Sequence, residues 1–153
     1  MKPRTQCPVP ITVKLRESIR APRERVFRAW TSPDEILRWL VPNPGRAVSA
    51  EVDLRPGGKY RIQVLIPGGG EEDLCGVFQE VAIPSRLVYT WSHVGNPDPE
   101  MAFGETLVTV EFEEANGYTI VHLTHSSFPA RALRDQFSHG WTMALTQLNN
   151  LFT

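Results

Sequence analysis

The chain has 153 residues, a length typical of one folded domain. Hydrophobic residues make up 41% of it and charged residues 22%, a composition that favours a globular protein and argues against disorder. Because 16 Lys and Arg face 17 Asp and Glu, the net charge of −1 offers little attraction for a phosphate backbone. We therefore expect no nucleic-acid partner.

The cysteines and the N-terminal region indicate the compartment. Cys7 and Cys75 are too few for a disulfide framework, which favours a reduced, intracellular protein. Pro3, Pro8 and Pro10 interrupt the region in which a signal peptide places its apolar core. No apolar stretch approaches the roughly 20 residues that span a bilayer. These features predict a cytoplasmic protein without membrane insertion.

The first elements are predicted to be a strand and two short helices. Residues 1–10 show no periodicity and are interpreted as a flexible arm, whereas apolar and polar residues alternate over 11–19 as in a half-buried strand. Pro22 begins a first helix, in which apolar residues follow at helical spacing. Ser32-Pro33-Asp34-Glu35 has the pattern of a capping box and predicts a second helix up to residue 40.

The middle of the chain has the pattern of short strands separated by turns rich in Gly, Pro and Asn. Alternating apolar and polar residues predict strands over residues 48–54, 59–66, 74–81, 87–94, 108–113 and 119–125. Because short turns join them, consecutive strands are expected to pair antiparallel.

After Pro129 the apolar spacing changes to that of a helix, which extends towards residue 153. Gly140 lies inside this helix and costs about 1 kcal/mol relative to alanine, which suggests either close packing against the sheet or space left for another molecule. A curved antiparallel sheet must cover its apolar face, and only this helix is long enough to do so. We therefore predict an α+β fold.

The order of elements and several local segments resemble the helix-grip superfamily, also described as START-like, SRPBCC or Bet v 1-like. Within it, the chain is most similar to homologues of the activator of heat shock protein 90 ATPase. The segments that carry the resemblance are residues 21–30, Leu-Arg-Trp at 37–39, Asp-Leu-Arg-Pro-Gly-Gly at 53–58, residues 76–80, residues 84–91 and Gly-Trp at 140–141.

The resemblance implies a single domain over residues 11–153, in which a sheet of six to seven strands wraps around the long C-terminal helix. It also implies an elongated, mostly apolar cavity between them. Relatives carry lipids, hormones or polyketides there, and a few catalyse cyclisation or dehydration. The co-chaperone that gives the family its name activates the heat shock protein 90 ATPase, and the match is to its C-terminal type of domain.

Side chains expected to point inward define a candidate ligand-binding site. Tyr and Trp combine an apolar body with a polar tip, which suits a small-molecule pocket. His125 has the inward parity of Val121 and Leu123, and we interpret it first as a hydrogen-bonded core histidine, with ligand recognition or acid–base catalysis as alternatives. The predicted cavity-lining residues are Trp39, Tyr60, Ile62, Val64, Phe78, Tyr89, Trp91, Val108, Val110, His125, Phe137, Trp141 and Leu145.

The other titratable residues predict no catalytic or metal site. His122 and His125 are three positions apart on one predicted strand, so they point to opposite faces and cannot chelate one metal ion. His93 is expected at a rim with little role, and His139 is expected to be exposed. Gly68-Gly69-Gly70 precedes an acidic run and is interpreted as a hairpin turn, not a phosphate cradle. We predict no metal, no cofactor and no catalytic residue.

Three functions remain open. The leading hypothesis is non-enzymatic binding of a small, largely hydrophobic molecule between the sheet and the C-terminal helix. An enzyme of the cyclase, dehydratase or hydrolase kind would use the same cavity, with His125, Tyr89 or Tyr60 as acid or base. A protein-interaction or chaperone-regulating module is the third. Edge strands permit a homodimer, although nothing in the sequence specifies one.

Overall fold

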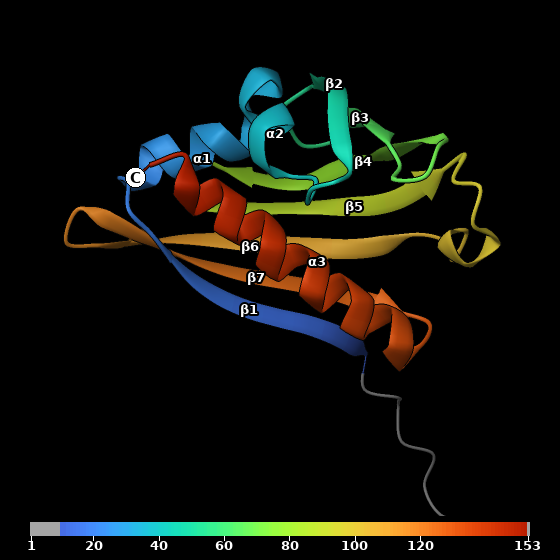
Figure 1. The fold of residues 1–153 in the computed structure, drawn as a ribbon. Helices are drawn as coiled ribbons and strands as arrows, with labels where there is room; N and C mark the ends of the chain where they lie inside the picture. The colour runs from blue at the N-terminus through green and yellow to red at the C-terminus, as the bar shows by residue number, and fades with distance from the viewer. Residues whose placement is uncertain (1–9, 153) are drawn as a thin grey trace, which may run out of the picture.

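The computed structural model describes residues 10–152, so Cys7 and nearly all of the predicted arm lie outside the described residues. Each predicted helix and strand is present (Figure 1). In chain order the elements are β1 (Ile11–Ile19), α1 (Arg23–Thr31), α2 (Pro33–Trp39), β2 (Arg46–Val52), β3 (Lys59–Leu65), β4 (Glu71–Ala82), β5 (Arg86–Val94), the short 3-10 helix η1 (Pro99–Met101), β6 (Thr106–Ala115), β7 (Tyr118–Phe128) and α3 (Arg131–Asn150).

The described residues contain one antiparallel sheet of seven strands in the order β1-β7-β6-β5-β4-β3-β2. Six of these strands follow one another as neighbours, as expected for strands joined by short turns. The exception is β1, which pairs with β7 at the opposite end of the chain. The prediction of an α+β fold with a curved antiparallel sheet is confirmed.

The core lies between one face of the sheet and the helices. α3 runs across the sheet, and α1 and α2 lie at one end of it (Figure 1). The buried stripe of α3 consists of Trp141, Ala144, Leu145 and Leu148, at the spacing of one helical face. β6 contributes alternate buried residues, as a strand with one covered face must. No helix within residues 10–152 combines the length and apolar character needed to cross a bilayer.

The predicted capping box at Ser32 is wrong. Ser32 precedes α2, but its side chain makes no capping hydrogen bond. Its backbone N–H, which the side chain of Glu35 would bind in a capping box, instead donates to the carbonyl of Arg28 and ends α1. Glu35 pairs with Arg25 and with Arg28 of α1. One residue thus ends α1 and begins α2, which leaves no free N–H for the box.

Candidate functional site

Between the sheet and the helices lie a small cavity, lined by α1, α2 and strands β2 to β5, and a larger open pocket beside α3. The small cavity has a volume of about 30 Å³, whereas the open pocket measures about 330 Å³. A buried water needs about 10–15 Å³ when volume is measured in this way. The small cavity therefore has space for two or three waters at most, and of these two spaces only the open pocket can accept an organic ligand.

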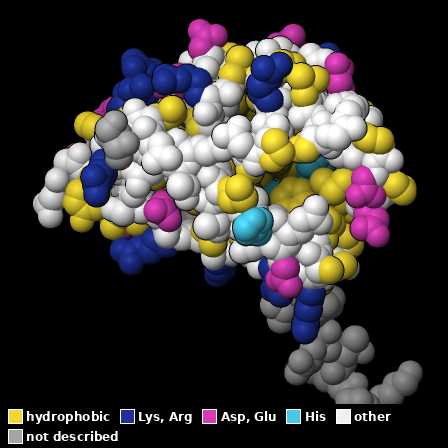
Figure 2. All heavy atoms as spheres, in the orientation of Figure 1, with side chains coloured by type: hydrophobic (Ala, Val, Ile, Leu, Met, Phe, Trp, Pro, Cys, Tyr) yellow, Lys and Arg dark blue, Asp and Glu magenta, His cyan; other side chains and the backbone are white. Residues whose placement is uncertain are grey.

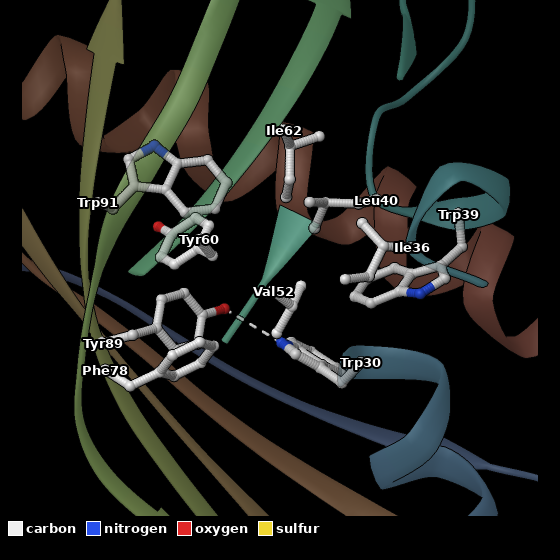
Figure 3. Close-up of a pocket in the computed structure, with 10 residues that line it drawn as sticks. All are labelled: Trp30, Ile36, Trp39, Leu40, Val52, Tyr60, Ile62, Phe78, Tyr89 and Trp91. Atoms are coloured by element: carbon white, nitrogen blue, oxygen red, sulfur yellow. Dashed lines mark hydrogen bonds between the residues drawn. The ribbon is translucent and has the colours of Figure 1, made fainter. Parts of the chain in front are cut away.

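Aromatic side chains form most of the lining of the small cavity. Figure 3 shows Tyr60, Phe78 and Tyr89 on the sheet facing Trp30 and Trp39 on the helices. The three sheet residues form a cluster of tilted and edge-to-face ring contacts, with centroids 5.4–5.8 Å apart.

The two tyrosine hydroxyls of this cavity are already engaged. The indole Nε1 of Trp30 donates to the hydroxyl of Tyr89 at 3.1 Å, and the hydroxyl of Tyr60 donates to the carbonyl of Thr90 at 2.6 Å. Burial raises the pKa of Tyr89 and of Tyr60 well above that of a free tyrosine. Neither hydroxyl is suited to act as an acid or base near neutral pH.

The open pocket lies between α3, the segment after α2 and the inward faces of β3, β4 and β5. Figure 2 shows it as a hollow in which hydrophobic side chains gather, with histidine at its edge. Its lining is mainly apolar, with a few polar groups, and consists of Leu40, Val41, Pro42, Val64, Glu72, Leu74, Trp91, His93, Met101, Gln136, Phe137, His139, Gly140, Trp141, Met143 and Ala144. Its size and character match those of pockets that bind small molecules.

Gly140 helps to open this pocket. A Cβ atom at this position would meet no atom within 4 Å, so the glycine does not serve close packing against the sheet. Of the two interpretations of Gly140, the structure therefore supports space left beside the helix. A larger residue here would project into the pocket.

A hydrogen-bonded group of polar residues forms the sheet side of the pocket. Nε1 of Trp91 donates to Nε2 of His93 at 2.9 Å, and Nδ1 of His93 lies 2.9 Å from Oε2 of Glu72. Asn96, in the turn after β5, donates to the same carboxylate oxygen at 2.6 Å. The side chains of His93 and Glu72 are only 4% and 10% exposed. The prediction that His93 has little role at a rim is therefore wrong, since it connects two residues of the pocket wall.

His125 lies deeper, behind the pocket, and is fully buried. Its Nδ1 accepts a hydrogen bond from Nε1 of Trp141 at 3.0 Å, so the ring proton is on Nε2, which lies 2.7 Å from the hydroxyl of Thr106. Burial lowers the pKa of His125 from 6.5 to about 3. This geometry agrees with the interpretation of His125 as a hydrogen-bonded core histidine.

The predicted site residues are divided between the two spaces. Trp39, Tyr60, Ile62, Phe78, Tyr89 and Trp91 line the small cavity. Val64, Trp91, Phe137 and Trp141 line the open pocket, so Trp91 lies between the two. The remaining predicted residues are buried in the core and belong to neither lining: Val108, Val110, His125 and Leu145.

Glu72 and His93 were missed as pocket residues. Glu72 belongs to the acidic run after the glycine turn, and the predicted strand began only at residue 74. The strand in fact begins at Glu71, and Glu72 has the same parity as the buried Leu74 and Phe78. Extending the alternation by two positions would have placed Glu72 on the inward face.

The His, Cys, Asp and Glu side chains of the described residues are dispersed over the fold. Across residues 10–152, His, Cys, Asp and Glu side chains do not form a group of three or more that could hold a metal ion. His122 is exposed and lies 3.0 Å from Glu113, on the opposite face of β7 from His125. The two histidines therefore do not share a site.

The curved antiparallel sheet, the helix across it and the pocket between them define a helix-grip, START-like protein. The chain matches the family model described as activator of Hsp90 ATPase homolog 1-like protein over residues 20–153, and it belongs to that family. A comparison with curated protein sequences gives no match.

Solved structures from several bacteria share the fold. Protein NE0264 from Nitrosomonas europaea is 27% identical with a TM-score of 0.77, and the match covers 92% of this chain and 93% of that one. Protein CV1439 from Chromobacterium violaceum is 24% identical with a TM-score of 0.77, over 92% and 96% of the two chains. Protein Ms6760 from Mycobacterium smegmatis is 20% identical with the same TM-score, over 94% and 91%.

Proposed function

We propose that the protein binds a small, largely apolar molecule, without chemical conversion, in the open pocket between α3 and the sheet. The observation that carries this proposal is a pocket of about 330 Å³ with a mainly apolar wall and a few fixed polar groups. Of the predicted ligand-binding residues, Val64, Trp91, Phe137 and Trp141 would contact the molecule.

The side chains predicted to act as acid or base in an enzyme, His125, Tyr89 and Tyr60, already form hydrogen bonds with other protein groups. Both ring nitrogens of His125 lie at hydrogen-bond distance from protein groups, and the hydroxyls of Tyr60 and Tyr89 have partners of their own. General acid–base catalysis requires a group that can reach the substrate and exchange a proton with it. This favours binding over the cyclase, dehydratase or hydrolase alternative.

Mass spectrometry and dye binding test the proposal. The protein is purified without detergent, its native and denatured masses are compared, and it is titrated with N-phenyl-1-naphthylamine, a neutral dye that fluoresces in apolar surroundings. We expect either a small-molecule adduct that is lost on denaturation or saturable dye binding. Absence of both in a folded protein would overturn the proposal.

A pair of variants locates the binding. Gly140→Leu places a side chain in the open pocket, whereas Ala132→Leu adds a comparable side chain at an exposed position of the same helix. We expect Gly140→Leu to weaken dye binding at least about tenfold, equivalent to about 1.4 kcal/mol, and Ala132→Leu to leave it unchanged. Equal affinity in both variants would place the dye elsewhere.

The cytoplasmic location and the homodimer are separate proposals. A reducing compartment is compatible with Cys75, which is a free, half-buried thiol on β4. The two edge strands, β1 and β2, carry backbone groups that a second copy could pair with. Sedimentation analysis tests the dimer: a mass near twice 17.2 kDa would support it, and a monomer at all concentrations would refute it.

A further inference from the structure

Of the described residues that line the open pocket, Glu72 is the only one with a carboxylate side chain. It pairs with Val64 in the register of β3 and β4, which places it on the inward face. Its neighbours in sequence point outward, where Glu71 accepts a hydrogen bond from Gln63 and Asp73 pairs with Arg61. Glu72 therefore differs from the rest of the acidic run in facing the pocket.

The two oxygens of this carboxylate differ in the hydrogen bonds that they accept. Oε2 accepts the hydrogen bonds from His93 and Asn96. Both hydrogen bonds that Glu72 accepts from other side chains of the described residues go to Oε2, and Oε1 accepts neither. A carboxylate has capacity for further donors, and a hydrogen bond to a charged group contributes more than one between neutral groups.

The hydrogen bond from Trp91 decides the charge of His93. An indole N–H can only donate, so Nε2 of His93 must carry a lone pair, and the ring is neutral with its proton on Nδ1. His93 consequently supplies Glu72 with a hydrogen bond but not with a positive charge.

Among the described residues of the pocket wall, the negative charge of Glu72 therefore has no cationic partner. Burial alone would raise the pKa of Glu72, but the hydrogen bonds from His93 and Asn96 outweigh it and hold the pKa below its usual range, so the group is ionised at neutral pH. The lining formed by residues 10–152 contains no Lys or Arg, and its other titratable members are His93 and the exposed His139. A charge removed from water is stabilised by an opposite charge close to it.

Aromatic rings complete the environment of a cation site. The same pocket is lined by Trp91, Trp141 and Phe137. The ring centroids of Trp91 and Trp141 are 5.5 Å apart. The faces of indole and phenyl rings attract cations, and indole does so most strongly. A carboxylate beside such rings favours an ammonium group attached to an apolar body.

We propose that the molecule bound in the open pocket is an organic cation, an amine with an apolar body, whose ammonium group donates to Oε1 of Glu72 while its body lies against Trp91, Trp141 and α3. This inference rests on the proposed binding function and adds the charge of the ligand to it. A neutral ligand of the same shape would leave the carboxylate without a counter-charge, and an anionic one would be repelled.

Three matched probes test the charge. Naphthalene-1-methylamine, naphthalene-1-methanol and naphthalene-1-carboxylate share one apolar body and differ in the charge of the attached group. In calorimetric titrations of the whole protein we expect the amine to bind at least about tenfold more tightly than the alcohol, equivalent to about 1.4 kcal/mol, and the carboxylate to bind most weakly. If amine and alcohol bind equally, the binding function stands and the cation inference is overturned. If none of the probes binds, both are overturned.

Matched charge variants assign the preference to Glu72. The amide of Glu72→Gln can still accept from His93 and Asn96, so the variant removes the charge and retains the hydrogen-bonded wall. Glu71→Gln makes the same change on the outward face. We expect Glu72→Gln to abolish the preference for the amine with the affinity for the alcohol unchanged, and Glu71→Gln to preserve the preference. A preference that persists in Glu72→Gln would refute the role of this residue.

Discussion

Nε1 of Trp141 donates a 3.0 Å hydrogen bond to Nδ1 of His125 and so joins α3 to β7 inside the core. The other ring nitrogen lies 2.7 Å from the hydroxyl of Thr106, which in turn donates to the carbonyl of Trp91 at 3.2 Å. The chain of contacts runs from the helix through β7 and β6 to β5. Trp141 and Trp91 are both pocket residues, so this buried chain fixes the back of the open pocket.

Removing the indole N–H should destabilise the protein. Trp141→Phe leaves Nδ1 of His125 buried without a donor, and we expect the free energy of unfolding to fall by about 1–3 kcal/mol in urea denaturation. In a background of His125→Leu the same substitution should cost less, with a coupling energy of about 1 kcal/mol or more. Additive effects in the double variant would show that the hydrogen bond contributes nothing.

His125 should also make stability depend on pH. The pKa of its ring is about 3 in the folded protein and 6.5 ordinarily, so the unfolded chain binds the proton first as the pH falls. This contribution is complete above pH 6.5 and is lost below it, with a slope that approaches about 1.4 kcal/mol for each pH unit. The pKa of Glu72 is also lowered, but from 4.5, so it adds a loss only at more acidic pH.

Urea denaturation between pH 7.5 and about pH 4.5 measures this slope. His125→Gln should flatten the curve over this range, whatever its effect on stability at neutral pH. His122→Gln, at the exposed histidine of the same strand, should leave the slope intact. An unchanged slope in His125→Gln would contradict the predicted proton linkage.

Alanine substitutions at Gly140 and Gly76 should change the free energy of unfolding in opposite directions. A Cβ at Gly140 meets no atom within 4 Å, so Gly140→Ala should raise the free energy of unfolding by about 1 kcal/mol through helix propensity. A Cβ at Gly76 would lie 2.0 Å from the carbonyl oxygen of Thr90, so Gly76→Ala should lower it by about 1–3 kcal/mol or more. Thermal denaturation checks both. A destabilised Gly140→Ala would mean that the space beside α3 is filled.

Gln147 should hold the segment that forms one side of the pocket opening. Its Nε2 donates to the carbonyls of Trp39 and Val41 at 2.9 and 3.0 Å, and its Oε1 accepts from the backbone N–H of Asn43 at 3.1 Å. Gln147→Ala should accelerate amide exchange in residues 40–45 and speed dye release. Thr146→Ala removes only a hydrogen bond within α3 and serves as the control. Equal exchange in both variants would show that the segment is held by other contacts.

The architecture was predictable because each element has a regular apolar period. The alternation in β6 and the helical stripe from Leu133 to Leu148 follow directly from which face is covered. The inward parity of His125 was predictable for the same reason. The capping box failed because Ser32 serves two helices at once, which a local pattern does not reveal.

The pocket was less predictable than the fold. Whether Tyr60 and Trp91 line a ligand site or fill a core depends on how side chains from α1, α2 and α3 meet the sheet, and this follows from packing, not from parity. Glu72 is the informative failure, since acidic residues beside a turn are usually solvated. Its inward position depends on where β4 begins, and strand ends are the least certain part of a pattern.

The place of β1 in the sheet has a consequence for how the chain reaches its folded state. Ile19 pairs with Thr119, one hundred positions later, and no other strand joins β1 to the sheet within the described residues. β1 is synthesised before β7, so its backbone groups have no strand to pair with until β7 has been made. Closing so long a loop is entropically costly and slows folding relative to local hairpins. The hairpins from β2 to β7 can assemble first, which makes docking of β1 the late step and its exposed edge the segment most open to misassembly while synthesis continues.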